Sequence, residues 1–167
     1  MHAKGHLGMA LLITFSLLSI FKLKSPNHIV LALLTAGLAT LPDIDIKLEL
    51  THRKYTHNIL SSIILGLFTA HLYKPLDQYT GFVAGFSATW IHILGDLPTH
   101  TPFPPLWPIL KKKVSLKLFK SNNPIINNTF WILGITTTLA YFLFIYSNTG
   151  HTLIDIIKQM INLLTRK

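Results

Sequence analysis

Residues 79–96 read YTGFVAGFSATWIHILGD, an apolar run that ends in His92 and Asp96. Four positions separate the histidine from the aspartate, so a helix places both on one face, one turn apart. An imidazole and a carboxylate so placed can bind the same metal ion or two adjacent ions. The alternative is a simple hydrogen bond between the two at a helix end. The stretch therefore predicts an apolar helix that carries metal ligands at its end.

Four further apolar runs accompany this one, and together they predict an all-α, polytopic membrane protein. The chain has 167 residues, of which 50% are hydrophobic and 13% charged, and its mean hydropathy is +0.45. Only the last run approaches the roughly 20 residues that cross a hydrocarbon core of about 30 Å. We therefore expect about four to five short transmembrane or re-entrant helices. The apolar runs are residues 5–21, 28–41, 58–73, 79–94 and 129–147.

The chain reads as a single integral membrane domain over residues 1–167. Residues 1–108 hold the candidate metal-site core, and 109–128 form a basic loop before the last span at 129–147. In the tail, at 151–167, apolar residues recur at helical spacing among polar ones, which predicts an amphipathic helix at the membrane surface. Gly81, Gly85 and Ala88 give the fourth run a small-residue face suited to close helix packing.

The basic residues predict the orientation of the spans. If the N-terminus is cytoplasmic and the five runs alternate, nine lysines and arginines lie inside and six outside. The same alternation places every ligand cluster on the cytoplasmic side of the cell membrane, inner or plasma. The net charge of +9 is confined to segments between the runs, and no nucleic-acid module accompanies it, so nucleic acid is not an expected partner.

Two carboxylates follow the second run. Pro42 is expected to stop that run near Leu41, which would leave Asp43 and Asp45 in extended chain with both side chains on one side. Carboxylates so close repel each other unless a cation lies between them. An ordinary loop with acidic helix-cap residues is the alternative.

Two histidines surround a basic segment farther along. His52 and His57 are five residues apart, which one continuous helix would not place on one face. Thr56 is expected to cap the next helix, so that His52 lies in the approaching loop and both rings turn to a common point. Arg53 could hold a phosphate or a ligating carboxylate, or be a surface cation.

The predicted ligands are nitrogen and oxygen donors only, because the chain has no cysteine. His6, at the start of the first run, completes the set. The predicted metal ligands are His6, Asp43, Asp45, His52, His57, His92 and Asp96, and the predicted catalytic residues are Asp43, Asp45, Asp96 and Arg53. Two or three Zn²⁺ ions suit an imidazole-rich set best, with Mn²⁺ and Fe as alternatives.

These blocks resemble a known family. MHAKGHL at 1–7, LPDID at 41–45, HRKYTH at 52–57 and HILGD at 92–96, with PPLWP following at 104–108, are similar to the membrane-bound metal-dependent hydrolase family, whose bacterial members include inner-membrane proteins under LexA control. A fainter similarity extends to zinc-dependent phospholipase C. The resemblance implies an α-helical integral membrane hydrolase with the seven ligands above as its motif positions.

Two departures from the family pattern concern residues beside the ligands. Where the family has Thr-Pro after the acid, this chain has Pro98-Thr99-His100-Thr101, and it has Thr56-His57-Asn58 in place of Thr-His-Ser. His100 could be an added ligand, a general acid or a loop residue facing water. The departures concern the substrate more than the class of reaction.

The predicted function is hydrolysis of a phosphoester, in a lipid or another interfacial substrate, by metal-activated water. Membrane lipids are the expected partners, and the basic loop at 109–128 would attract anionic phospholipid as a substrate. One alternative is a noncatalytic membrane protein with a structural metal cluster. Another is a divalent-metal transporter, which would need ionisable groups near mid-membrane, where these runs offer only Gly, Ser and Thr. The oligomeric state is not predicted.

Overall fold

The computed structural model describes residues 1–47, 53–73 and 77–149, together with positions 155, 157, 158, 161, 162 and 165 of the tail. The described chain is helical, as predicted, and has no strand beyond isolated bridges. Its elements are α1 (Ala3–Ile20), α2 (Pro26–Leu38), the 3-10 helix η1 (Leu41–Asp43), α3 (Ile44–Lys47), α4 (Ile59–Leu72), α5 (Gln78–Asp96) and α6 (Pro124–Thr149). Each of the five apolar runs corresponds to one of the five long helices.

Local signals explain where these helices begin. Pro26 occupies the first turn of α2, where its missing N–H and fixed φ are no disadvantage. The Asn58 side chain accepts a hydrogen bond from Ser61 N at 3.0 Å, and Ser61 reciprocates, which makes a capping box for α4. Helix α6 begins five residues before the predicted run, because Pro124 starts it and Asn123 Oδ1 accepts from the backbone of Ile125 at 3.0 Å.

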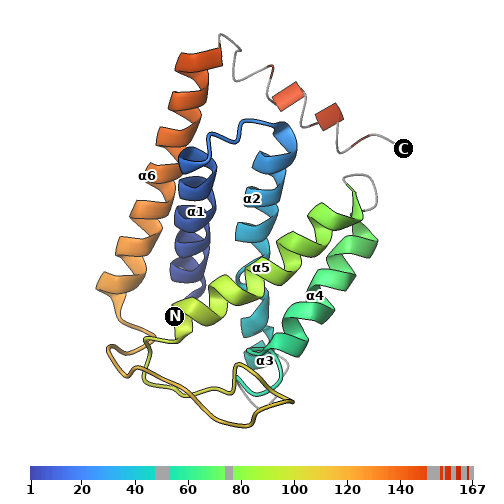
Figure 1. Ribbon diagram of the computed structural model, residues 1–167. Helices are drawn as coiled ribbons and strands as arrows, with labels where there is room; N and C mark the ends of the chain where they lie inside the picture. The colour runs from blue at the N-terminus through green and yellow to red at the C-terminus, as the bar shows by residue number, and fades with distance from the viewer. Residues whose placement is uncertain are drawn as a thin grey trace.

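The helices pack in a layered bundle in which α1 lies between α6 and α2, and α5 lies between α2 and α4 (Figure 1). Glycines allow the two closest crossings. A Cβ on Gly8 would lie 2.5 Å from the backbone of Trp131 in α6. On the other side, a Cβ on Gly81 would lie 2.8 Å from Ala70 Cα in α4, and Gly85 faces Leu65 at a similar distance. The predicted small-residue face of α5 therefore does make a close helix contact.

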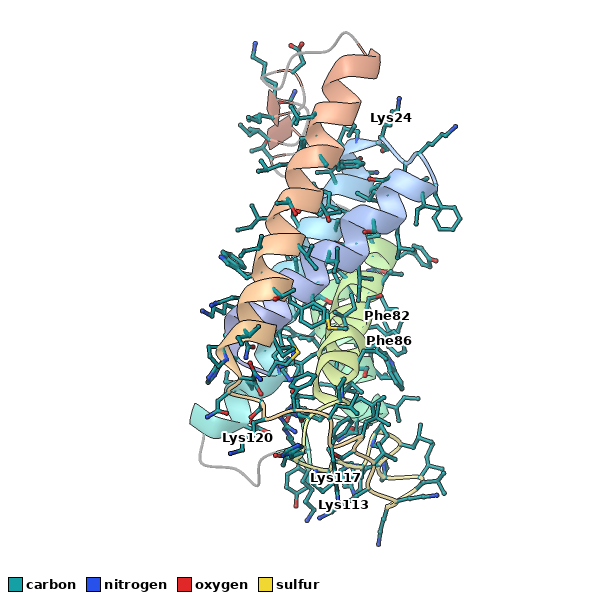
Figure 2. All side chains as sticks on the ribbon, turned by 90° about the vertical axis from the view of Figure 1, so that its left-hand side faces the viewer. Lys24, Phe82, Phe86, Lys113, Lys117 and Lys120 are labelled. Atoms are coloured by element: carbon teal, nitrogen blue, oxygen red, sulfur yellow. The ribbon has the colours of Figure 1, made fainter. Side chains whose placement is uncertain are left out.

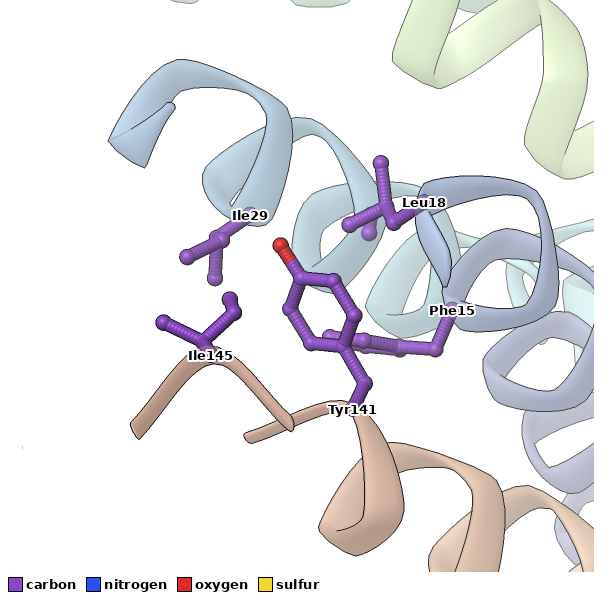
Figure 3. Packing of buried hydrophobic residues seen from close by; sticks show 6 residues of the cluster. Phe15, Leu18, Ile29, Tyr141 and Ile145 are labelled. Carbon is purple, nitrogen blue, oxygen red and sulfur yellow. The ribbon is translucent and has the colours of Figure 1, made fainter. Parts of the chain in front are cut away.

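Two hydrophobic layers fill the space around α1. The first, shown in Figure 3, joins α1, α2 and α6 through Phe15, Leu18, Ile29, Ala32, Tyr141 and Ile145. The Tyr141 hydroxyl donates to Leu23 O at 2.6 Å, so this buried polar atom is satisfied. The second layer consists mainly of alanines and holds α1, α2 and α5 together: Ala10, Ala36, Ala39, Ala88 and Ile91. Its small side chains let the three helices converge toward the end of α5.

One end of the bundle gathers the start of α1, η1, the start of α4 and the end of α5 (Figure 1). The loop between α5 and α6 crosses the same end and contains no helix, as its prolines predicted. It folds back on itself, because Phe103 and Val114 exchange backbone hydrogen bonds of 3.2 and 2.9 Å. Lys113, Lys117 and Lys120 lie at this end and Lys24 lies at the other (Figure 2).

The helix α6 also fixes the start of α1. Asn127 is fully buried, and its Oδ1 accepts the backbone N–H of His2 at 2.9 Å. Its Nδ2 donates to Ser121 O at 3.0 Å and to Asn123 O at 2.7 Å, so the side chain has no freedom to turn. The first turn of α1 is therefore held in place by a residue of the last helix.

The outer faces of the helices are apolar. Ile64, Leu67 and Phe68 of α4 are more than half exposed, as is Leu143 of α6. Among the described helices, α1 is the one that is both long and apolar enough to cross a membrane, and α4 is apolar but shorter. The number of crossings stays a prediction, and most of the predicted amphipathic tail lies outside the described residues.

The prediction of extended chain at the two acidic residues was wrong. Asp43 ends the 3-10 helix η1, and Asp45 lies in α3, which follows it directly. Pro42 is the physical reason, because a proline that ends one helix is well accepted in the first turn of the next. The helical turn still directs both carboxylates to the same end of the bundle as the histidines.

Candidate metal centre

Four side chains from three parts of the chain converge at this end. They are Asp43 of η1, His57 just before α4, and His92 and Asp96 in the last turns of α5. Each offers one ligand atom, and these atoms all lie within 4.8 Å of one another. His57, His92 and Asp96 are fully buried, whereas the side chain of Asp43 is 19% exposed. The group has the donor types and the size of a metal site.

The individual distances show that both histidines point their Nε2 atoms at both carboxylates. His57 Nε2 lies 3.2 Å from Asp96 Oδ2 and 3.7 Å from Asp43 Oδ1. His92 Nε2 lies 3.6 and 3.5 Å from the same two atoms. The two Nε2 atoms are 2.9 Å apart. These separations suit side chains that surround a cation.

The other ring nitrogens determine which tautomers are present. His92 Nδ1 lies 2.7 Å from the carbonyl oxygen of Ala39, which can only accept, so Nδ1 carries the proton. His57 Nδ1 lies 2.8 Å from Thr56 Oγ1, and that hydroxyl donates to Asp45 Oδ2 at 2.7 Å, so His57 Nδ1 is also a donor. In the neutral rings both Nε2 atoms then carry lone pairs. Two lone pairs at 2.9 Å require a positive particle, which is a proton or a metal ion.

His6 is a fifth member of the cluster. Its ring stacks on that of His92 with centroids 3.6 Å apart, and its Nε2 lies 3.3 Å from Asp96 Oδ1. Both ring nitrogens are buried, and neither makes a hydrogen bond within the described part of the chain. Gly95 makes room for this ring, because a Cβ there would lie 3.0 Å from His6 Nδ1. A buried imidazole without hydrogen bonds suits a metal ligand.

Asp45 is not one of the four clustered ligands but contacts residues next to them. Its Oδ2 accepts hydrogen bonds from Arg53 N at 2.8 Å and from Thr56 Oγ1 at 2.7 Å, and it lies 3.8 Å from His57 Nδ1. The prediction of Thr56 as a helix cap was wrong, because Asn58 caps α4. Instead, the Thr56 hydroxyl links Asp45 to His57 by two hydrogen bonds and so orients that ring.

Arg53 is bound to the centre and to the loop that covers it. Its Nη2 lies 2.9 Å from Asp96 Oδ2, and its Nη1 donates to Thr99 Oγ1 at 2.9 Å and to Thr101 O at 2.8 Å. Thr99 Oγ1 in turn donates to Asp96 O at 2.7 Å. Arg53 has a φ of 63°, an uncommon value for a residue other than glycine. These contacts hold that conformation and set the orientation of Asp96.

The centre is electrostatically suited to a further cation. Among the residues that the structure describes, the carboxylates of Asp43, Asp45 and Asp96 gather here with the positive charges of Arg53 and the amino terminus, which contacts Asp96. Burial by itself raises the pKa of Asp43, but the neighbouring imidazoles of His57 and His92 outweigh this, so its pKa is held well below the usual range. Asp43 is therefore ionised at neutral pH.

The remaining sequence candidates fall into two groups. His52 lies outside the described residues. His2 and His100 are exposed, and neither belongs to the cluster of described ligands. The sequence alone did not point to Ala39, whose carbonyl selects the His92 tautomer, or to Gly95. Thr99 belongs to a stretch that departs from the family pattern, so the sequence did draw attention to it. Its hydrogen bond to Arg53 was not predicted.

Together these features define a helical membrane protein with a buried histidine–aspartate cluster that could bind a metal ion. The chain belongs to the YdjM inner membrane protein family, which matches residues 1–154. No curated protein and no solved structure was found to match it.

A Thr56→Val variant tests the link between Asp45 and His57. Valine keeps the size of the side chain but cannot hydrogen-bond, so His57 loses the partner that fixes its tautomer. We expect metal affinity to fall by roughly 10- to 100-fold, the usual effect of losing such an outer partner. Competition with a chromophoric chelator measures the affinity, and Thr56→Ser, which keeps the hydroxyl, should bind within a few fold of the wild type. Equal affinity in Thr56→Val would contradict the assigned tautomer.

Proposed function

We propose that this protein is a metal-dependent hydrolase of the membrane that cleaves a phosphoester in a lipid or another interfacial substrate. The observation that carries the proposal is the convergence of two imidazole lone pairs and two carboxylates on one buried point. When bound, a divalent ion would supply Lewis acidity, which lowers the pKa of water and neutralises charge on a phosphoryl group. Two or three ions, Zn²⁺ above Mn²⁺ or Fe, are part of the proposal.

The residues of the centre have different proposed roles. His57, His92 and Asp96 are buried and would hold the metal, and His6 would extend the set toward a second ion. Asp43 is the ligand with an exposed edge, so it is the carboxylate that would reach substrate and orient the attacking water. Arg53 fixes Asp96 by its short ion pair. Asp45 acts through Thr56 and Arg53 and touches neither metal nor substrate.

A cavity of about 460 Å³ lies between α1, α2 and α5 and supports an interfacial substrate. Its lining is almost wholly apolar, and Trp90 and Ile91, which directly precede His92, contribute to it. The hydrocarbon part of a lipid fits such a space, and its polar end would then lie near the metal centre. A structural metal cluster would have no need of this cavity. The multi-pass topology, with the N-terminus and centre on the cytoplasmic side, belongs to the same proposal.

The experiment compares metal content, turnover and stability in one preparation. The protein is purified in detergent, its metals are measured by mass spectrometry, and it is assayed against phospholipids and soluble phosphoesters before and after chelation. We expect two or more metals per chain and turnover that chelation removes and the same metal restores. Metal without turnover on any substrate, together with a lower melting temperature after chelation, would instead support the structural cluster. Turnover unaffected by chelation would contradict the proposal.

A further inference from the structure

A second group of charged side chains lies beside the metal centre. An open cavity of about 520 Å³ lies between the segment just before α4 and the loop between α5 and α6. Among the described residues, its walls include four cations and two aromatic rings but no acidic side chain. We refer to it as the basic pocket, and its principal residues are Arg53, Lys54, Tyr55, Trp107, Lys111 and Lys113. A concave surface with charge of one sign concentrates ions of the other.

The lysines of the basic pocket are paired with no carboxylate of the described residues. Across the described chain, none of Lys54, Lys111 and Lys113 forms an ion pair, and Lys54 Nζ instead lies 4.8 Å above the ring of Tyr55. Three uncompensated ammonium groups around one cavity repel each other. A bound anion would relieve this repulsion, so the charge pattern favours an anionic ligand over a neutral one.

Tertiary contacts on both sides hold the walls of the basic pocket in place. The rings of Tyr55 and Trp107 meet edge to face with centroids 5.5 Å apart, which joins the two segments. Ile59 N donates to Pro105 O at 2.9 Å, so the first turn of α4 also holds the loop. Phe103, between two pocket prolines, is fully buried with its ring 6.1 Å from that of His57. The pocket is therefore formed before a ligand arrives.

Arg53 joins the basic pocket to the metal centre. It lines the pocket, and its Nη2 lies 2.9 Å from Asp96 Oδ2. A chemical group bound in the pocket beside Arg53 is thus separated from the metal ligand Asp96 only by the Arg53 side chain. We propose that the basic pocket binds a phosphate group of the substrate, either in a lipid head group or in a soluble phosphoester. This inference rests on the proposed function, and it names the part of the substrate that the pocket recognises.

Titration calorimetry with inorganic phosphate tests the basic pocket on metal-loaded protein in detergent. In a Lys111→Gln/Lys113→Gln variant we expect the phosphate affinity to fall roughly tenfold, because two charge-assisted contacts are lost. The matched control is Lys112→Gln/Lys120→Gln, which removes the same charge from exposed lysines of the same loop that do not line the pocket. It should change the affinity less than twofold. Equal weakening in both variants, or none in either, would overturn the proposal.

The same variants separate this inference from the proposed function. Metal content is measured in each, and KM is compared for glycerol phosphate and for phosphatidic acid in mixed micelles. A raised KM for phosphatidic acid in the pocket variant alone identifies a lipid head group, and a raised KM for glycerol phosphate identifies a soluble ester. Phosphate binding that needs Lys111 and Lys113 in a protein without turnover would support the pocket and contradict the hydrolase. Turnover with an unchanged KM for both substrates would contradict the pocket.

Discussion

A His92→Gln variant is expected to lose its metal almost completely. The glutamine amide reaches the position of Nε2, which faces His57, Asp43 and Asp96, but an amide oxygen binds Zn²⁺ far more weakly than an imidazole nitrogen. It also leaves Ala39 O without the donor that Nδ1 supplied. Loss of an outer partner alone costs roughly 10- to 100-fold in affinity, so loss of the ligand itself should cost at least about 100-fold. Mass spectrometry of purified protein should show less than about a tenth of the wild-type metal content.

His100→Gln is the matched control for this variant. It makes the same chemical change eight residues farther along, at an exposed position outside the cluster. Metal content and turnover should stay at the wild-type level. If His100→Gln also lost metal, or if His92→Gln kept it, the metal centre assigned to the end of α5 would be wrong.

A Gly8→Leu variant should be the most destabilising single change away from the metal centre. A side chain at Gly8 would meet the backbone of Phe130 and Trp131 at 2.5 Å, and backbone atoms cannot turn aside as a flexible side chain can. Helices α1 and α6 would have to separate along their whole crossing. We expect a loss of about 3 kcal/mol in the free energy of unfolding, at the upper end for an overpacked core.

Unfolding by heat or by titration with a denaturing detergent measures this loss. Gly37→Leu is the control, because Gly37 lies in α2 and a Cβ added there would meet nothing within 4 Å. Leucine is the better helix former, so this control should be neutral or more stable by up to about 1 kcal/mol. A Gly8→Leu protein as stable as the wild type would show that α1 and α6 do not cross at this point.

The sequence was sufficient to predict the long helices, because an apolar run bounded by proline, lysine and polar residues can form few other structures. It was also sufficient to predict that five ligands share one end of the bundle, because helices that alternate in direction return to the same end. These ligands are His6, Asp43, His57, His92 and Asp96. It failed at Pro42, where the same residue can end a helix or begin one. Local rules gave the wrong answer because two opposite outcomes fit the same residue.

The contacts around the ligands could not be predicted, since they join segments far apart in the chain. Thr56 had the right residue type for a helix cap, but Asn58 took that role and left the threonine hydroxyl for His57. The carbonyl of Ala39 carries no side-chain signal at all. The pair of Gly8 with Trp131 is similar, because a glycine in an apolar run does not reveal which helix approaches it.

Asn127 fixes the start of α1 by a hydrogen bond, and this has a consequence for shortened versions of the protein. A chain cut after residue 123 would keep every candidate ligand in its sequence, from His6 to Asp96, yet it would lack the amide that binds His2 N. It would also expose the glycine face on which α6 rests. The first helix would then be free to slide and turn, carrying His6 away from His92. A fragment chosen by motif alone would contain the ligands without the centre.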